Sequence, residues 1–181
     1  MDSTPKLKLW IPKFPKLKLW TPTPLRFKEK NMVTVFDVAA FILTKLGPTP
    51  AMKLQKLVYY SQAWSLVWDE EPLFQEKIYA WINGPVVPEL YDIHKGQFKV
   101  AATEIPGNPE ALNETQKETV EAVLDYYGDK KSQWLSDLTH LEKPWQDARV
   151  ELAPDERGHT EITHAALAEY YGSLEPKNAH G

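Results

Sequence analysis

The spacing of apolar side chains predicts two long helices early in the chain. From Val35 to Leu46 apolar residues recur every three or four positions, and Gly47 followed by Pro48 ends the pattern. The same spacing returns from about Ala51 to Trp68 and gives that helix an apolar stripe. We expect this stripe to face the core; its members are Leu54, Leu57, Val58, Ser61, Trp64 and Trp68.

The later part of the chain predicts shorter elements, most of them helical. The first of them are a strand over 76–82, a turn at Gly84 and Pro85, and a helix from Pro88 to about Lys95. A loop over 97–112 follows, with one short strand near 98–101, and then a helix that is opened by a capping box at Asn113–Gln116 and stopped by Gly128. The last elements are helices over 132–140, 144–150 and 163–171, the last closed by Gly172. This order predicts a mainly α fold with a small β element (α+β). We expect a compact single helical domain over 32–174, an extended N-terminal arm over 1–31 and a frayed tail over 175–181.

The arm differs from the rest of the chain in charge and in pattern. Residues 1–31 hold eight Lys or Arg and two acidic residues, whereas residues 32–181 hold 13 and 23. The sequence Pro-Lys-Leu-Lys-Leu-Trp occurs at Pro5–Trp10 and again at Pro15–Trp20; its alternation is typical of an extended strand, and its prolines exclude a helix.

Three interpretations of the arm stay open. It could add strands to a partner protein, it could lie along nucleic acid, or it could be inert because Met32 is a plausible alternative start. Under the first interpretation the partner-binding residues are Leu7, Leu9, Trp10, Leu17, Leu19 and Trp20.

Composition and motifs argue against most catalytic chemistry. The chain has no cysteine, which excludes disulfides, thiolate metal sites and cysteine nucleophiles and is compatible with a cytoplasmic location. It has no stretch of roughly 18–20 apolar residues that could span a membrane. A phosphate-binding glycine loop, a His-Glu-x-x-His sequence and a Gly-x-Ser-x-Gly sequence are all missing. We therefore expect a protein that is not an enzyme and holds no cofactor and no metal.

One cluster of polar residues, Asp137, His140 and Glu142, allows two interpretations. The three side chains could form an acid/base group. They could instead cap helix ends and position Trp145, which we favour because such residues commonly serve at caps and turns.

Residues 32–172 resemble the Panacea domain family, the SocA-like or GepA-like phage-associated antitoxins. The resemblance is carried by Met52–Trp64 and by Ala80–Tyr91, and its most specific runs are Met52–Trp64 and Gly84–Tyr91. It extends in order through Val35–Val38, Glu71–Phe74, Leu135–His140, Pro144–Trp145, Ala148–Arg149, Glu156–Arg157 and Tyr170–Tyr171.

The resemblance implies a role in binding. It implies an antitoxin of a bacterial or prophage two-gene system, which neutralises a toxin encoded by an adjacent gene through direct protein contact. We expect the family's motif residues to be structural: Leu54, Gln55, Leu57, Tyr59, Tyr60, Gln62, Trp64, Trp81, Gly84, Pro85, His140, Pro144 and Trp145. The alternatives are an adaptor that presents a partner to a protease or another host machine and, with less support from an acidic body, a nucleic-acid-binding regulator.

Overall fold

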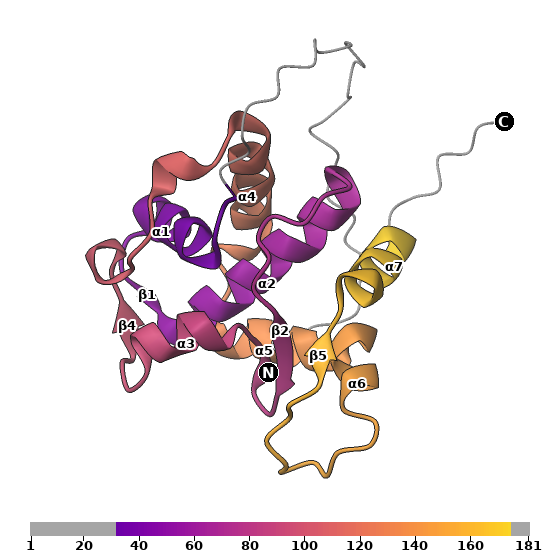
Figure 1. The fold of residues 1–181 in the computed structure, drawn as a ribbon. Coiled ribbons are helices and arrows are strands. Elements are labelled where there is room, and N and C mark those ends of the chain that lie inside the picture. The colour runs from indigo at the N-terminus through magenta and orange to yellow at the C-terminus, as the bar shows by residue number, and fades with distance from the viewer. Residues whose placement is uncertain (1–31, 175–181) are drawn as a thin grey trace, which may run out of the picture.

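The computed structural model describes residues 32–174. The predicted contact residues of the arm, Leu7, Leu9, Trp10, Leu17, Leu19 and Trp20, lie outside the described residues, as does the predicted tail. Mainly helical elements with small antiparallel sheets make up the fold, so the predicted α+β class is confirmed (Figure 1).

The elements follow the predicted order closely. The helices are α1 (Val35–Leu46), α2 (Ala51–Trp68), α3 (Pro88–His94), α4 (Glu114–Tyr127), α5 (Ser132–Leu141), α6 (Lys143–Ala148) and α7 (His164–Leu174). The strands are β1 (Thr49–Pro50), β2 (Ile78–Trp81), β3 (Gly84–Val86), β4 (Lys99–Val100) and β5 (Glu161–Ile162), and two 3₁₀ turns, η1 (Ala102–Glu104) and η2 (Pro109–Ala111), lie in the predicted loop.

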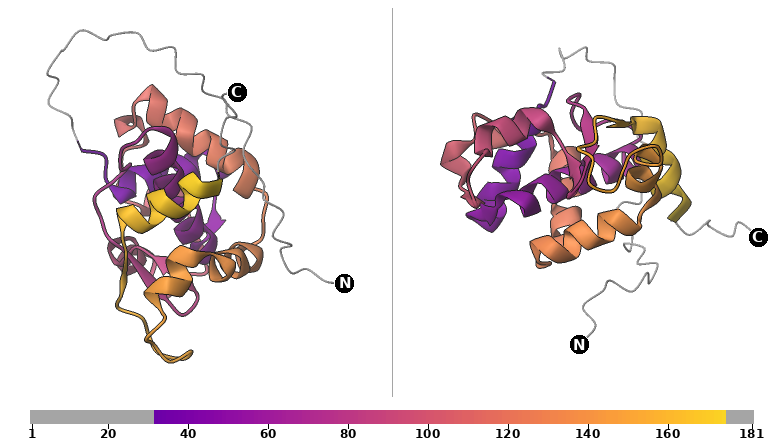
Figure 2. Two further views of the ribbon diagram at one scale, coloured as in Figure 1. Left: turned by 90° about the vertical axis from the view of Figure 1, so that its right-hand side faces the viewer. Right: turned by 90° about the horizontal axis from the view of Figure 1, so that it is seen from below.

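Helix α2 is the centre of the fold. It packs against α1, α4, α5, α7 and β3, and Figures 1 and 2 show it enclosed by these neighbours. The predicted apolar stripe is buried from Leu54 to Trp64, but the burial extends around the whole helix. Polar side chains outside the stripe, Gln55, Lys56 and Gln62, are therefore also inside the protein. None of the helices among residues 32–174 is long and apolar enough to cross a membrane.

The sheet around β2 corrects one prediction. Strand β2 pairs antiparallel with both β3 and β5, and the β2–β3 turn is made by Ile82 and Asn83. Gly84 and Pro85 are not the turn but the first residues of β3, with Gly84 opposite Trp81. Glycine is needed here because its φ is +108° and because a Cβ would lie 2.5 Å from Cε of Lys56.

The helix ends show which sequence signals correctly predicted where a helix begins or ends. Asn113 and Gln116 form the predicted capping box of α4, each side chain bonding the other residue's backbone at 2.9 Å. Gly172, however, does not close the last helix, because α7 continues to Leu174. Glycine costs only about 1 kcal/mol inside a helix, and Leu174 packs against the core beyond it.

A buried carboxyl lies where α2, α6 and α7 meet. Oε2 of Glu142 accepts hydrogen bonds from the hydroxyls of Tyr171 at 2.6 Å and Tyr60 at 3.0 Å. Because the one hydroxyl proton of Tyr171 goes to Glu142, the Tyr59 hydroxyl, 3.1 Å away, donates to the oxygen of Tyr171. Burial raises the pKa of Glu142 to about 8, against the opposing effect of these hydrogen bonds. The expected capping role is wrong for Glu142, because it precedes α6 but its side chain makes no capping bond.

The other two residues of that polar cluster have different partners. Asp137 accepts a hydrogen bond from Gln133 on the exposed side of α5. The ring of His140 packs on Trp145, with the ring centroids 4.1 Å apart, so the expected role of positioning Trp145 fits this residue.

Candidate functional site

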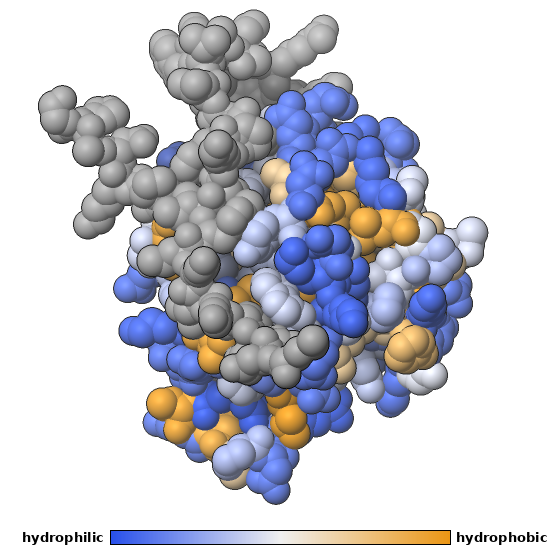
Figure 3. Space-filling view, turned by 180° about the vertical axis from the view of Figure 1, so that it is seen from behind, coloured by the Kyte–Doolittle hydropathy of each residue, from blue (hydrophilic) through white to orange (hydrophobic). Residues whose placement is uncertain are grey.

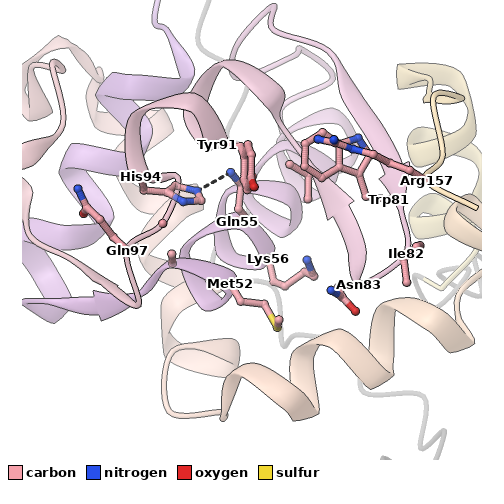
Figure 4. Close-up of a pocket in the computed structure, with 13 residues that line it drawn as sticks. Met52, Gln55, Lys56, Trp81, Ile82, Asn83, Tyr91, His94, Gln97 and Arg157 are labelled. Carbon is pink, nitrogen blue, oxygen red and sulfur yellow. Dashed lines mark hydrogen bonds between the residues drawn. The ribbon is translucent and has the colours of Figure 1, made fainter. Parts of the chain in front are cut away.

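A pocket of about 420 Å³ opens between the N-terminal half of α2, the β2–β3 hairpin, α3 and the loop before β5 (Figure 4). Its walls combine apolar, aromatic and basic side chains. The lining residues are Ala51, Met52, Gln55, Lys56, Trp81, Ile82, Asn83, Val86, Tyr91, His94, Gly96, Gln97 and Arg157. A hollow of this size and mixed lining is typical of a binding site.

One wall is aromatic and carries a cation. Trp81 packs edge-on against Tyr91 at 4.9 Å, and the guanidinium of Arg157 lies 4.3 Å from the centre of the Trp81 ring. Figure 4 shows Arg157 over the Trp81 ring at the edge of the pocket. Trp81 is held from behind by Trp145, whose indole N–H donates to the Trp81 carbonyl at 2.8 Å. The fold thus fixes the backbone that carries this wall.

The position of Arg157 depends on a second arginine. Arg149 is buried and donates to the carbonyl of Ala80 in β2 at 2.8 Å and to the carbonyl of Glu156 at 2.7 Å. Gly158 lies so close to the Ala80 carbonyl that a Cβ would overlap it. These contacts attach the loop to β2 and thereby bring Arg157 over Trp81.

We expect Arg149→Met to release this loop. The substitution removes three charge-assisted hydrogen bonds to carbonyls but keeps an apolar stem, so we expect a loss of about 2 kcal/mol in the free energy of unfolding and faster amide exchange over residues 150–160. Hydrogen exchange by mass spectrometry measures this change. Arg157→Met is the control, because its exposed side chain makes no such bonds among the described residues; equal exchange in both variants would contradict the role given to Arg149.

A hydrogen-bonded amide and imidazole continue the aromatic wall beyond Tyr91, whose ring packs edge-on against His94 at 5.5 Å. Gln55 accepts from the Val87 N–H at 2.9 Å, and its Nε2 lies 2.9 Å from Nε2 of His94. Since an amide nitrogen can only donate, the facing imidazole nitrogen is the acceptor and His94 is neutral. Burial lowers the pKa of His94, which agrees with this assignment.

Lys56 lies at the base of the pocket. It is only 1% exposed, and its ammonium donates to the Pro85 carbonyl at 3.1 Å. In Figure 4 its amine points toward Asn83. Burial lowers the pKa of Lys56 from its ordinary value of 10.5 to about 7. A buried lysine beside an open pocket is a plain candidate for contact with a ligand.

The pocket is basic in an acidic body. Lys56 and Arg157 line it, and none of the described lining residues is Asp or Glu. Among residues 32–174 no group of three His, Asp or Glu side chains could hold a metal ion. The arrangement therefore suits recognition of an apolar group with a negative or hydrogen-bond-accepting end.

Comparison with known families decides what kind of protein carries this pocket. Residues 54–146 match the family model described as antitoxin SocA-like, Panacea domain. The chain belongs to the SocA-like Panacea family. A search of curated proteins and a search of solved structures found no match.

The Panacea match covers most of the pocket but not all of it. Lys56, Trp81 and His94 lie inside the matched residues, whereas Met52 and Arg157 lie outside them. The pocket therefore joins parts of the family domain to flanking residues of this chain.

The predicted motif residues of the Panacea domain are placed in three groups. Gln55 and Trp81 line the pocket, and Gly84 and Pro85 contact Lys56 beneath it. Tyr59 and Tyr60 surround Glu142. Leu54, Leu57 and Trp64 are buried in the core. Gln62 forms hydrogen bonds with the backbone of Leu73 and Phe74. His140, Pro144 and Trp145 pack around the hairpin and α6.

Sequence reasoning missed Lys56, Tyr91, His94 and Arg157 as pocket residues. Lys56 lies off the apolar stripe of α2, where a lysine is ordinarily expected in solvent. The other three come together with it only through the tertiary fold. The Glu156–Arg157 motif was the one signal in the sequence that pointed to this loop.

Proposed function

We propose that this Panacea protein is an antitoxin that neutralises a toxin protein by direct contact, and that the pocket and its surroundings are the contact surface. The proposal rests on the family, which is antitoxin-like, and on one structural observation. Trp81 and Arg157, two residue types that dominate protein interfaces, stand together at the edge of a hollow with exposed apolar neighbours.

Exposed apolar side chains surround this pocket. Met52 and Ile82 line it and are each 38% exposed, and Phe98, next to the lining residue Gln97, is 80% exposed. The carbonyl of Phe98 accepts from the N–H of Ala51, which fixes the segment against the start of α2. On the face opposite to that of Figure 1, the visible surface is mostly hydrophilic, with apolar residues in small separate groups (Figure 3). The pocket thus offers anchors around a preformed hollow.

The arm adds a second proposed contact. Its alternating Leu and Lys residues suit strand addition to a partner, and its positive charge is opposite to that of the body. We propose that Leu7, Leu9, Trp10, Leu17, Leu19 and Trp20 extend the contact made by the pocket. Deletion of residues 1–31 tests this part separately, because it leaves the whole pocket in place.

Co-expression tests the proposed function. The product of the neighbouring gene is expressed alone and together with this chain, and the tagged chain is used in a pull-down. We expect growth arrest by the neighbour alone, rescue by this chain and a stable complex. Rescue that requires a host protease would indicate the adaptor function instead, and no complex with no rescue would exclude the proposal.

Phe98→Ala locates the surface. Because Phe98 is 80% exposed, its removal is expected to leave stability within about 0.5 kcal/mol of the wild type. As an anchor it should weaken the complex by about 10- to 100-fold in Kd, measured by titration calorimetry. Val150→Ala is the matched control, because Val150 is 79% exposed and, unlike Phe98, is not next to a pocket-lining residue in the sequence. Equal affinities for the two variants would place the interface elsewhere.

A further inference from the structure

The charge of the pocket singles out one kind of ligand group. Lys56 and Arg157 face a hollow without a single acidic lining residue among those described, although Asp and Glu outnumber Lys and Arg by 23 to 13 over residues 32–181. The acidic side chains of the body are thus kept away from this position. A positive hollow in a negative body attracts an anion locally and repels extended polyanions overall.

Lys56 has unused capacity to donate. A lysine ammonium has three N–H donors, and among the described residues it uses one, toward the Pro85 carbonyl. The Lys56 side chain runs so close to Gly84 that a Cβ at that position would lie 2.5 Å from Cε of Lys56. Its amine is therefore held at the base of the pocket with donors available to a ligand.

The walls above the amine limit what the ligand can be. Met52, Ile82 and Trp81 offer apolar contacts, which suit a carbon chain better than a fully hydrated ion. The Asn83 amide and the Arg157 guanidinium add donors at the pocket lining. An organic carboxylate on a short apolar stem matches this order of groups.

We propose that the pocket receives an Asp or Glu side chain of the partner protein, flanked by apolar residues, with Lys56 as its counter-charge. This inference rests on the proposed function, because it names the partner chemistry at the same site. The net positive charge of residues 1–31 has the same sign as Lys56 and Arg157 and therefore favours a partner protein over these residues as the source of the carboxylate. The carboxylate would also offset the burial of the ammonium and raise the pKa of Lys56 from about 7.

A pair of peptides tests the pocket without any knowledge of the partner. The full chain, labelled with ¹⁵N, is titrated with acetyl-Leu-Glu-Leu-amide and with acetyl-Leu-Gln-Leu-amide, and inorganic phosphate serves as a third probe. We expect the Glu peptide to shift the NMR signals of Lys56 Nζ, the Trp81 indole and the Asn83 amide, to raise the pKa of Lys56, and to bind at least about 10-fold more tightly than the Gln peptide. Equal binding of the two peptides, shifts on another surface, or phosphate binding as tight as the Glu peptide would overturn the proposal.

Variants connect the pocket to the partner. Lys56→Met should abolish the difference between the two peptides, whereas Lys53→Met, a lysine on the same helix that bonds Gly128 and does not line the pocket, should preserve it. In the toxin complex we expect Lys56→Met to weaken binding by about 30-fold or more. If the toxin binds the Lys56→Met variant as tightly as the wild type, the carboxylate proposal fails and the antitoxin function stands. If no toxin binds at all, the antitoxin function fails and the peptide pair still decides the chemistry of the pocket.

Discussion

Replacing Glu142 with alanine is expected to lower the free energy of unfolding by about 3 kcal/mol. The substitution empties a fully enclosed space and removes the acceptor of the Tyr60 and Tyr171 hydroxyls. Both losses are individually costly in a core, one as a cavity and the other as unpaired buried donors. Urea denaturation of the full chain at constant pH measures the change.

Glu142→Gln separates the charge of this group from its shape. Because the folded protein holds the pKa of Glu142 at about 8, above its ordinary value of 4.5, the folded state binds more protons than the unfolded state between these values. The contribution of Glu142 is therefore fully present below about pH 4.5 and is lost as the pH rises through 8. The loss amounts to roughly 3–5 kcal/mol by pH 9, at 1.36 kcal/mol for each pH unit.

The amide of Glu142→Gln does not titrate, so the stability of this variant relative to the wild type should rise steadily from about pH 5 to pH 8. The groups that face Glu142 are tyrosines on three helices: Tyr59 and Tyr60 on α2, Tyr127 on α4, and Tyr170 and Tyr171 on α7. Because burial raises the pKa of each of these tyrosines, none of them titrates between pH 5 and pH 8. Glu121→Gln is the control, since Glu121 forms a half-exposed pair with Lys45 and should show little pH dependence. A Glu142→Gln curve parallel to that of the wild type would contradict a neutral carboxyl in this cluster.

The elements of the fold were readable from local patterns because their signals are local. The α1 periodicity ends at Gly47 as predicted, and the Asn113–Gln116 box opens α4. Gly84 was wrongly predicted to form a turn. In the sequence, a glycine that a strand needs for the close approach of a neighbouring side chain cannot be distinguished from a glycine that a turn needs. Gly172 misled because packing beyond it outweighs its weak helix propensity.

The site was much less readable, for a different reason. A stripe of apolar residues predicts which side of α2 faces a core, but here the hairpin and α5 also cover the other side and bury Lys56. Glu142 is enclosed in the same way by α2 and α7, which are distant in sequence. Arg157 meets Trp81 only because Arg149 attaches the intervening loop to β2. Long-range packing determines the placement of Lys56, Glu142 and Arg157, and the spacing of residues along the chain does not predict it.

Lys56→Met is expected to have the opposite effect on stability from Glu142→Ala. Methionine has a similar length and no charge, so it fills the same space without the penalty of a buried ammonium. The wild type has a depressed Lys56 pKa, about 7 in place of 10.5, and therefore bears a cost that is fully present below pH 7 and disappears as the pH rises to about 10.5. Even after loss of the bond to Pro85, we expect the variant to gain about 2–4 kcal/mol at pH 6 and almost nothing at pH 10.

A measured gain in stability would argue that Lys56 serves binding and not folding. A residue that weakens the folded chain and yet lies at the base of a pocket fits a group retained for contact with a ligand. Thermal and urea denaturation at pH 6, 8 and 10 measure the gain, with Lys53→Met as the matched control, expected to stay within about 1 kcal/mol of the wild type. A Lys56→Met variant that is more stable than the wild type and no longer prefers the Glu peptide would show that Lys56 lowers stability and supports binding. A destabilised variant would instead assign Lys56 to the structure, through its bond to Pro85 and its packing against Gly84.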